Sequence, residues 1–136
     1  IVGRINGTHS EPGLVAVHYL RRSLPQEDLV AYYMAADVMV VTPFRDGMNL
    51  VAKEYVACRS EEDGVLVLSE FTGAAHELKQ AMLVNPFDID ATTATLRDAL
   101  RMEPTEARRR MRALRRTVRR HDVYKWANEF LGASAA

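Results

Sequence analysis

Short apolar runs alternate with stretches of helical periodicity along the first two thirds of the chain. The runs predicted as strands are residues 15–20, 38–41, 65–68 and 81–84. The segments between them place apolar residues at helical spacing, and these are residues 26–36, 50–59 and 74–80. Short strands that alternate with helices favour parallel pairing through right-handed crossovers. The sequence therefore predicts an α/β fold of the Rossmann-like class, a parallel sheet with helices on both faces.

After Asp88 the pattern becomes helical only. Asp88 or Asp90 is a candidate N-cap, Pro104 is placed to open a second helix, and Asp122 is placed to cap a third. No apolar strand follows in the sequence, so we expect these C-terminal helices to have no strands to cover. The first residue is Ile rather than Met, and we expect the chain to be a piece of a longer one.

Charge is divided unevenly between the two parts of the chain. Residues 1–96 carry 7 basic and 13 acidic side chains, whereas residues 97–136 carry 11 basic and 5 acidic ones. The basic excess comes from arginines that surround an apolar stripe at helical spacing, formed by Ala107, Met111, Leu114 and Val118. No aromatic residues interleave with this charge as they do in single-strand binders. We therefore interpret the arginines as a solvated helix face and expect no nucleic-acid partner.

Several other functional classes lack support in the sequence. No apolar run approaches the roughly 18 to 20 residues of a membrane span, and we expect a soluble, cytoplasmic protein without a membrane partner. The single Cys58 forbids an internal disulfide, and the four histidines show no metal-ligand spacing. We expect no metal and no cofactor. The glycine motifs of dinucleotide-binding and P-loop proteins are missing from the sequence.

The loop after the predicted strand 38–41 is the richest candidate site. In an open parallel sheet the ligand lies beyond the carboxyl ends of the strands, and this loop then enters a helix near Leu50. The first amides of a helix have no intrahelical partner and, with the helix dipole, favour an anion. Gly47 lets backbone approach a ligand closely, and Asp46 offers a carboxylate to hydroxyl groups. We predict a phosphate at this helix terminus.

Glu54 is a second carboxylate on the same predicted helix, eight residues after Asp46. The two acids could bracket the ends of a molecule whose diphosphate rests on the amides between them. In the alternative interpretation, Asp46 merely caps the helix and Glu54 pairs with Lys53 or an arginine. The spacing alone leaves both interpretations open.

The run ADVMVVTPFRDGMNLVAKEYVACR, residues 36–59, closely resembles the signature of trehalose-6-phosphate synthases. The resemblance continues through VGRING, GVLVLSEFTGAAHEL and LVNPFD, at residues 2–7, 64–78 and 83–88, and through His121, Asp122 and Trp126. It implies part of the C-terminal, donor-binding domain of a glycosyltransferase with two Rossmann-like domains. On this basis we assign residues 1–102 to the nucleotide-sugar-binding domain and residues 103–136 to a C-terminal helical tail.

The resemblance also implies roles for individual residues. Asp46 is similar to the family's catalytic-site acid that binds hydroxyls of the donor glucose, and Glu54 to the acid that binds the ribose hydroxyls. Leu24 resembles the position whose backbone contacts the nucleobase. Met48, Asn49 and Leu50 resemble the residues whose main-chain amides meet the glucose and the diphosphate. Gly47 before them and Val51 after them complete the expected donor-binding set.

Family membership would imply glucosyl transfer, with retention, from a nucleoside diphosphate glucose such as UDP-glucose to glucose 6-phosphate, giving trehalose 6-phosphate. The acceptor would be held mainly by an N-terminal domain outside these residues, so we expect the isolated 136 residues to be inactive. Two alternatives stay open: a glucosyltransferase with another phosphorylated acceptor such as glycerol 3-phosphate, and a noncatalytic regulatory module derived from the synthase. A homo-oligomer is compatible with the sequence.

Overall fold

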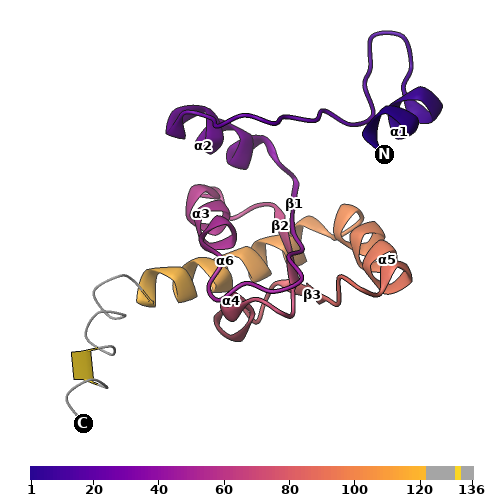
Figure 1. Cartoon of the computed structure of the whole chain (residues 1–136). Coiled ribbons are helices and arrows are strands. Elements are labelled where there is room, and N and C mark those ends of the chain that lie inside the picture. Colours follow the sequence, from indigo (N-terminus) through magenta and orange to yellow (C-terminus); the bar gives the residue numbers. More distant parts are fainter. Residues whose placement is uncertain (122–130, 133–136) are drawn as a thin grey trace.

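Three parallel strands form the centre of the computed structural model, which describes residues 1–121 and 131–132 (Figure 1). The strands are β1 (Val38–Val41), β2 (Val65–Ser69) and β3 (Met82–Val84), and β2 lies between the other two. The helices with assigned bounds are α1 (Val2–His9), α2 (Gln26–Ala35), α3 (Leu50–Cys58), α4 (Gly73–Glu77), α5 (Ile89–Leu100) and α6 (Pro104–Arg120). The parallel α/β class predicted from the sequence is confirmed.

β2 is the central strand because every one of its residues is apolar or small, and all five are buried. Its alternate side chains point to opposite faces of the sheet. Leu66 and Leu68 enter one apolar cluster, whereas Val65 and Val67 enter another. A strand buried on both faces in this way is typical of parallel sheets covered by helices.

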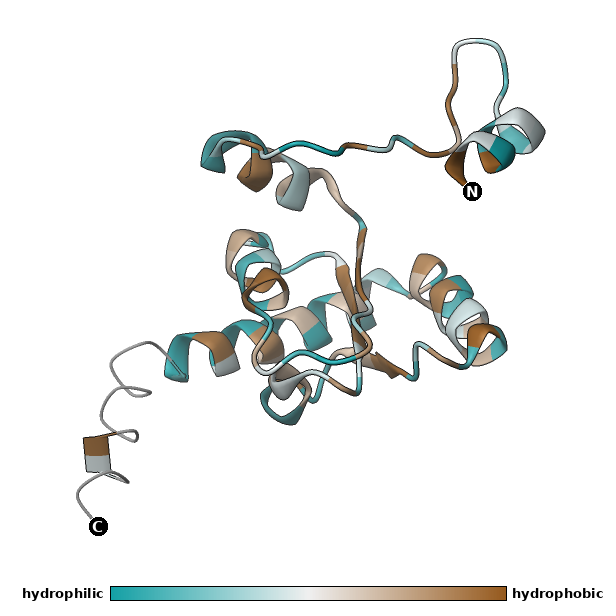
Figure 2. Cartoon of the chain, in the orientation of Figure 1, coloured by the Kyte–Doolittle hydropathy of each residue, from teal (hydrophilic) through white to brown (hydrophobic). Residues whose placement is uncertain are grey.

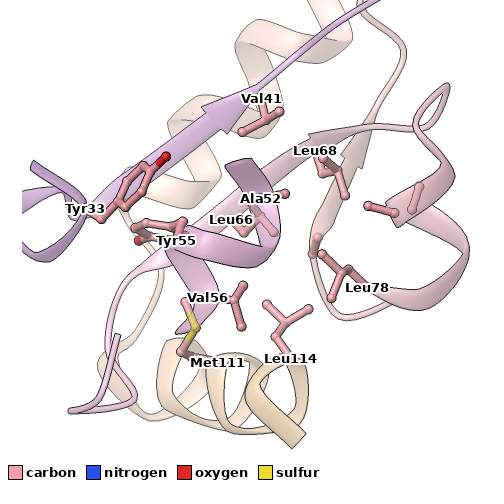
Figure 3. Packing of buried hydrophobic residues seen from close by; sticks show 13 residues of the cluster. Tyr33, Val41, Ala52, Tyr55, Val56, Leu66, Leu68, Leu78, Met111 and Leu114 are labelled. Atoms are coloured by element: carbon pink, nitrogen blue, oxygen red, sulfur yellow. The ribbon is translucent and has the colours of Figure 1, made fainter. Parts of the chain in front are cut away.

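The larger cluster fills the space between one sheet face and helices α2, α3, α4 and α6 (Figure 3). Its fully buried members include Tyr55 and Val56 of α3, with Leu66 of β2 beneath them. Met111 and Leu114 of α6, which lies next to α3, complete the cluster. This packing fixes the position of α3, whose amino end follows the candidate loop.

The opposite sheet face is covered by α5 and the first turn of α6. Ala99 of α5 and Ala107 of α6 are buried against Val65, Val67 and Val84 of the sheet. Helices therefore lie on both faces, as predicted. Figure 2 shows the strands as an apolar centre between helices of mixed hydropathy.

The apolar stripe of α6 is confirmed, but the expectation that the C-terminal helices cover no strands is wrong. Ala107, Met111 and Leu114 are buried in the two clusters, and Val118 packs against the larger one. α6 packs on apolar residues of the sheet that the other helices leave uncovered. The order of elements along the chain does not show that such surface remains. The predicted boundary after residue 102 lies in the short connection between α5 and α6 and stays a prediction.

Several arginines of α6 bond within the protein. The Arg115 guanidinium donates to the carbonyl oxygens of Val56 and Ala57 at the carboxyl end of α3, at 3.0 and 2.7 Å. Glu106 accepts from Arg109 and Arg110, and these hydrogen bonds lower the pKa of its carboxyl to about 2. Part of the basic surface thus serves helix packing and local ion pairing.

The predicted strand at residues 15–20 is wrong, because this segment has no neighbouring strand among the described residues. The backbone of Val17 instead bonds to the side chain of Asn6, with its N–H donating to Oδ1 at 2.8 Å and its carbonyl accepting from Nδ2 at 2.9 Å. Asn6 belongs to α1, a helix that the sequence analysis did not predict. Figure 1 shows α1 apart from the sheet, joined to α2 by an extended segment.

The remaining predicted elements are confirmed within a few residues at their ends. α4 covers Gly73–Glu77 rather than residues 74–80, and β3 begins at Met82. The Asp88 carboxylate caps α5 by accepting from the Ala91 amide, as predicted. The predicted cap at Asp122 lies outside the described residues. In the part of the chain that the structure describes, no helix has the length and apolar character to cross a membrane.

Candidate functional site

The loop between β1 and α3, residues 42–49, lies at the carboxyl edge of the sheet and is fastened to the amino end of α4. The amides of Gly73 and Ala74 donate to the carbonyl oxygens of Asp46 and Met48, both at 2.9 Å. A Cβ on Gly73 would lie 2.0 Å from the carbonyl oxygen of Gly47. The close contact between the loop and α4 therefore requires glycine at position 73.

The Asp46 carboxylate binds back onto its own loop. Its Oδ1 accepts from the amides of Met48 and Asn49, both at 3.0 Å, and its Oδ2 accepts from the Asn49 side-chain Nδ2 at 2.9 Å. The Met48 amide above all, followed by the Asn49 side chain, lowers the pKa of this carboxyl from its usual value. Asp46 is thus an ionised acceptor held in place by three N–H groups.

Some of the amides expected to be free at this terminus have a hydrogen-bond acceptor within the protein, and others do not. Those of Met48 and Asn49 are occupied by Asp46, so the expectation of free donors is wrong there, because a nearby carboxylate supplies the anion. The Ala52 amide donates to the Asn49 side chain at 2.9 Å. Within the described residues no acceptor bonds the amides of Leu50 and Val51, two residues that are 58% and 41% exposed. These two amides are the donors that the helix leaves open.

Glu54 lies on the exposed side of α3, and its partner is Tyr33 rather than Lys53. The Tyr33 hydroxyl donates to Glu54 Oε2 at 3.0 Å, whereas Lys53 pairs with Glu77 at 2.9 Å. Burial, followed by the hydrogen bond to Glu54, raises the pKa of Tyr33 to about 12. The alternative pairing of Glu54 with Lys53 is thereby excluded, although Asp46 does bind the helix-terminal amides as that interpretation expected.

The structure brings most of the predicted site residues into one loop and one helix. Gly47 has open space where a side chain would begin, with no atom within 4 Å of a Cβ built there. Asp46 and Glu54 flank the open amides of α3 along the chain. Leu24 lies apart from this loop in the sequence, half buried in the segment that leads into α2.

Sequence reasoning missed two features near this edge. The contact of Tyr33 with Glu54 is one of them: Tyr33 lies in the predicted helix at residues 26–36, where its hydroxyl was the only sign of a polar contact. Phe44, Phe71 and Phe87 follow β1, β2 and β3 respectively and form an exposed aromatic cluster. Phe44 stacks on Phe87 with ring centroids 4.7 Å apart, and Phe71 lies 5.9 Å from Phe87. The sequence signal for this aromatic cluster was one phenylalanine shortly after each strand.

Other possible sites are weaker. In the described ranges, no three His, Cys, Asp or Glu side chains gather as a metal site would require. A hollow of about 60 Å³ lies at the carboxyl end of α3, lined partly by Cys58 and Arg59. It lies at the opposite end of the helix from Asp46. The loop at residues 42–49, with the first turn of α3, is therefore the best candidate site.

Comparison with known proteins gives matches over nearly the whole chain. The profile of glycosyltransferase family 20 matches residues 1–135. The trehalose-6-phosphate synthase of Mycolicibacterium smegmatis is 60% identical over 135 residues, which are 99% of this chain and 27% of that protein. The trehalose-6-phosphate synthase of Mycobacterium leprae is 60% identical over 134 residues, with 98% and 27% coverage. The chain thus spans about a quarter of the length of these curated relatives.

Solved structures agree with these relatives. An alpha,alpha-trehalose-phosphate synthase (UDP-forming) from Burkholderia xenovorans, in complex with glucose-6-phosphate, superposes with a TM-score of 0.93 at 42% identity, covering 99% of this chain and 30% of that one. A structure described as trehalose-6-phosphate from E. coli bound with UDP-2-fluoro glucose gives a TM-score of 0.92 at 41% identity, covering 97% and 30%. The fold of the described residues is therefore that of a segment of these proteins.

Proposed function

The chain belongs to glycosyltransferase family 20, and from this premise we propose that it forms part of the donor site of a trehalose-6-phosphate synthase. The reaction proposed for the full-length enzyme is glucosyl transfer, with retention, from a nucleoside diphosphate glucose to glucose 6-phosphate. The product would be trehalose 6-phosphate. Residues 1–102 would belong to the nucleotide-sugar-binding domain, and residues 103–136 would form the helical tail.

One observation carries this proposal: two carboxylates flank a helix terminus with open amides. Asp46 is held at the entrance of α3, the amides of Leu50 and Val51 have no acceptor among the described residues, and Glu54 follows on the same helix. An arrangement of acid, anion-binding amides and acid suits a molecule with hydroxyl groups at both ends and a diphosphate between them. A nucleoside diphosphate sugar has this chemistry.

We assign the diphosphate to the amides of Leu50 and Val51. Negative charge grows on the nucleoside diphosphate as the bond to glucose breaks, and fixed N–H groups stabilise that charge without reorganising. The positive end of the α3 dipole adds to the effect. Removing one such donor typically costs about 3 kcal/mol of transition-state stabilisation.

Asp46 is assigned to the hydroxyls of the donor glucose and Glu54 to those of the ribose. The lowered pKa of Asp46 keeps its carboxylate ionised and ready to accept hydrogen bonds. The Tyr33 hydroxyl uses one oxygen of Glu54, and the other oxygen is available to the ribose. Leu24 is assigned to the nucleobase through its backbone, and Gly47 gives the ligand room beside the loop.

An assay of the full-length enzyme tests this function directly. Incubated with UDP-glucose and glucose 6-phosphate, it should release UDP and form trehalose 6-phosphate, and the isolated 136 residues should not. Glycerol 3-phosphate in place of glucose 6-phosphate tests the alternative acceptor. A full-length protein that binds UDP-glucose but transfers glucose to neither acceptor would support a regulatory module instead.

The proposal also covers the enzyme's partners, its cellular location and its oligomeric state. Its partners would be the sugar nucleotide and the phosphorylated acceptor, with the acceptor held mostly by residues outside this chain. We propose a cytoplasmic enzyme because both substrates are phosphorylated and charged, and molecules of this chemical type are held inside cells. Fractionation of cells and the molar mass in solution test the location and any homo-oligomer.

A further inference from the structure

Resting on the proposed donor site, we infer that the side chain of Asn49 is a positioning residue. It holds the Asp46 carboxylate in the orientation that receives the donor glucose. Asn49 was expected to contribute only its main-chain amide, and its side chain is a separate feature. The inference depends on two hydrogen bonds and on the backbone conformation of this residue.

The Asn49 amide group connects the carboxylate to the first turn of α3. Its Nδ2 donates to Asp46 Oδ2 at 2.9 Å, and its Oδ1 accepts from the Ala52 amide at 2.9 Å. One planar group thus satisfies a helix-terminal N–H and an acceptor on the loop together. Displacement of the carboxylate would disturb the cap of the helix, and the cap in turn restrains the carboxylate.

The backbone of Asn49 lies in the left-handed region, with φ 66° and ψ 87°. Few residues other than glycine and asparagine adopt this region readily. The conformation places the N–H of Asn49 on Asp46 Oδ1 while its side chain reaches Oδ2. Asparagine therefore meets two requirements here, tolerance of a positive φ and a side-chain donor beside the carboxylate.

The number of acceptor positions on Asp46 explains why the side chain matters. A carboxylate has about four lone-pair positions. Two amides occupy Oδ1, and Asn49 Nδ2 occupies one position of Oδ2, so one position on Oδ2 remains for a hydroxyl group. Bonds to Oδ1 alone would leave the broad terminal torsion of Asp46 less restrained. The Nδ2 contact fixes that torsion and, with it, the open position.

The test replaces Asn49 in the full-length enzyme by Asp. Asn49→Asp keeps an oxygen for the Ala52 amide and a side chain of the same size, but removes the donor to Asp46 and places a second carboxylate there. We expect affinity for UDP-glucose to fall at least about tenfold, as for the loss of a charge-assisted hydrogen bond. Affinity for UDP, which lacks the glucose, should fall by a clearly smaller factor, because the added negative charge repels the diphosphate of both ligands whereas displacement of Asp46 affects only the glucose contact.

The pH dependence of kcat/KM supplies a readout that a purely structural role would not move. Two adjacent carboxylates raise the pKa of one of them, so the acid limb of the Asn49→Asp profile should move to higher pH. Asn85→Asp is the matched control, because Asn85 lies at the same sheet edge, its Oδ1 accepts from the Phe87 amide at 3.0 Å, and the side-chain hydrogen bonds of Asp46 among the described residues do not include it. This control should leave both ligand affinities and the acid limb in place.

Asn49→Gly covers the case in which the Asp variant does not fold. Glycine tolerates the left-handed backbone but lacks both side-chain bonds, so it should also weaken UDP-glucose more than UDP. The inference is overturned if the soluble variants bind UDP-glucose like the wild type, or if UDP and UDP-glucose weaken equally. An inactive wild-type enzyme would overturn the proposed function instead, since the comparison of variants presupposes transfer by the wild type.

Discussion

The two ends of α3 treat their polar groups in opposite ways. At the carboxyl end, Arg59 is 5% exposed and donates to the carbonyl oxygens of Tyr33, at 3.2 Å, and Met34, while Arg115 bonds to the last carbonyls of the helix. At the amino end, the amides of Leu50 and Val51 have no acceptor among the described residues. The carboxyl end is therefore built for packing, and the amino end retains hydrogen-bonding capacity for a ligand.

The difference separates stability from function along a single helix. Substitutions at the carboxyl end should lower the free energy of unfolding and change ligand binding little in the molecules that remain folded. Substitutions at the amino end should weaken ligand binding and change the free energy of unfolding little. Each variant below is studied in the full-length enzyme, where both properties can be measured.

The largest effect on stability is expected from Gly64→Ala, at the carboxyl end. Gly64 has φ +80°, and a Cβ there would lie 2.3 Å from the Tyr55 hydroxyl oxygen. Strain of the backbone and displacement of Tyr55 together should cost about 3 kcal/mol or more, measured as a lower Tm. The control is Gly47→Ala, whose added Cβ meets no atom within 4 Å. Equal Tm values for the two variants would contradict the assignment of the ends.

Arg59→Leu should lower the free energy of unfolding by about 2 to 4 kcal/mol. The carbonyls of Tyr33 and Met34 would lose their donor, and Asp63 would lose its partner at 2.8 Å. Chemical denaturation measures the change. Arg112→Leu serves as the matched control, because its ion pair with Glu62 is on the surface and such pairs contribute about 1 kcal/mol at most. A cost for Arg59 no larger than for Arg112 would refute the packing role.

Glu54→Gln, on the ligand-facing side, should weaken UDP binding about 10- to 100-fold while leaving the Tm nearly unchanged. The neutral amide loses a charge-assisted hydrogen bond to the ribose but keeps an oxygen for the Tyr33 hydroxyl. Calorimetric titration measures the affinity. Glu61→Gln, in the turn beyond α3, is the control and should bind UDP normally. Unchanged affinity in Glu54→Gln would argue against the ribose assignment.

The smallest effect concerns alkaline pH. Burial first of all raises the pKa of both Tyr33 and Tyr55 to about 12. The folded protein therefore keeps phenol protons that the unfolded chain releases near pH 10, so their stabilisation is complete below pH 10 and is lost as pH rises toward 12. Tyr33→Phe should reduce the slope of Tm against pH in this window. An identical slope would show that the hydroxyl titrates normally.

Prediction from the sequence was most accurate where a segment finds all its partners within the chain. β1 and α3 were located within one residue because their apolar residues pack on β2 and α6, which the chain supplies. The segment at residues 15–20 is also mostly apolar, yet it forms no strand because no neighbouring strand is present among the described residues. Strand propensity alone does not create a sheet.

The sequence predicted those features of the candidate site that depend on local sequence. The position of Asp46 and Glu54 relative to the helix follows from local sequence, since both lie within nine residues of each other. The partners of these acids come from elsewhere: Tyr33 from α2, and the amides that fasten the loop from α4. Contacts between elements depend on packing angles that hydrophobic periodicity does not specify.

The most direct test is a crystal structure of the full-length enzyme with a nucleoside diphosphate glucose bound. The account predicts diphosphate oxygens within hydrogen-bond distance of the Leu50 and Val51 amides, a glucose hydroxyl on Asp46 and the ribose on Glu54. A diphosphate bound elsewhere, with these two amides bonded only to protein atoms, would contradict it.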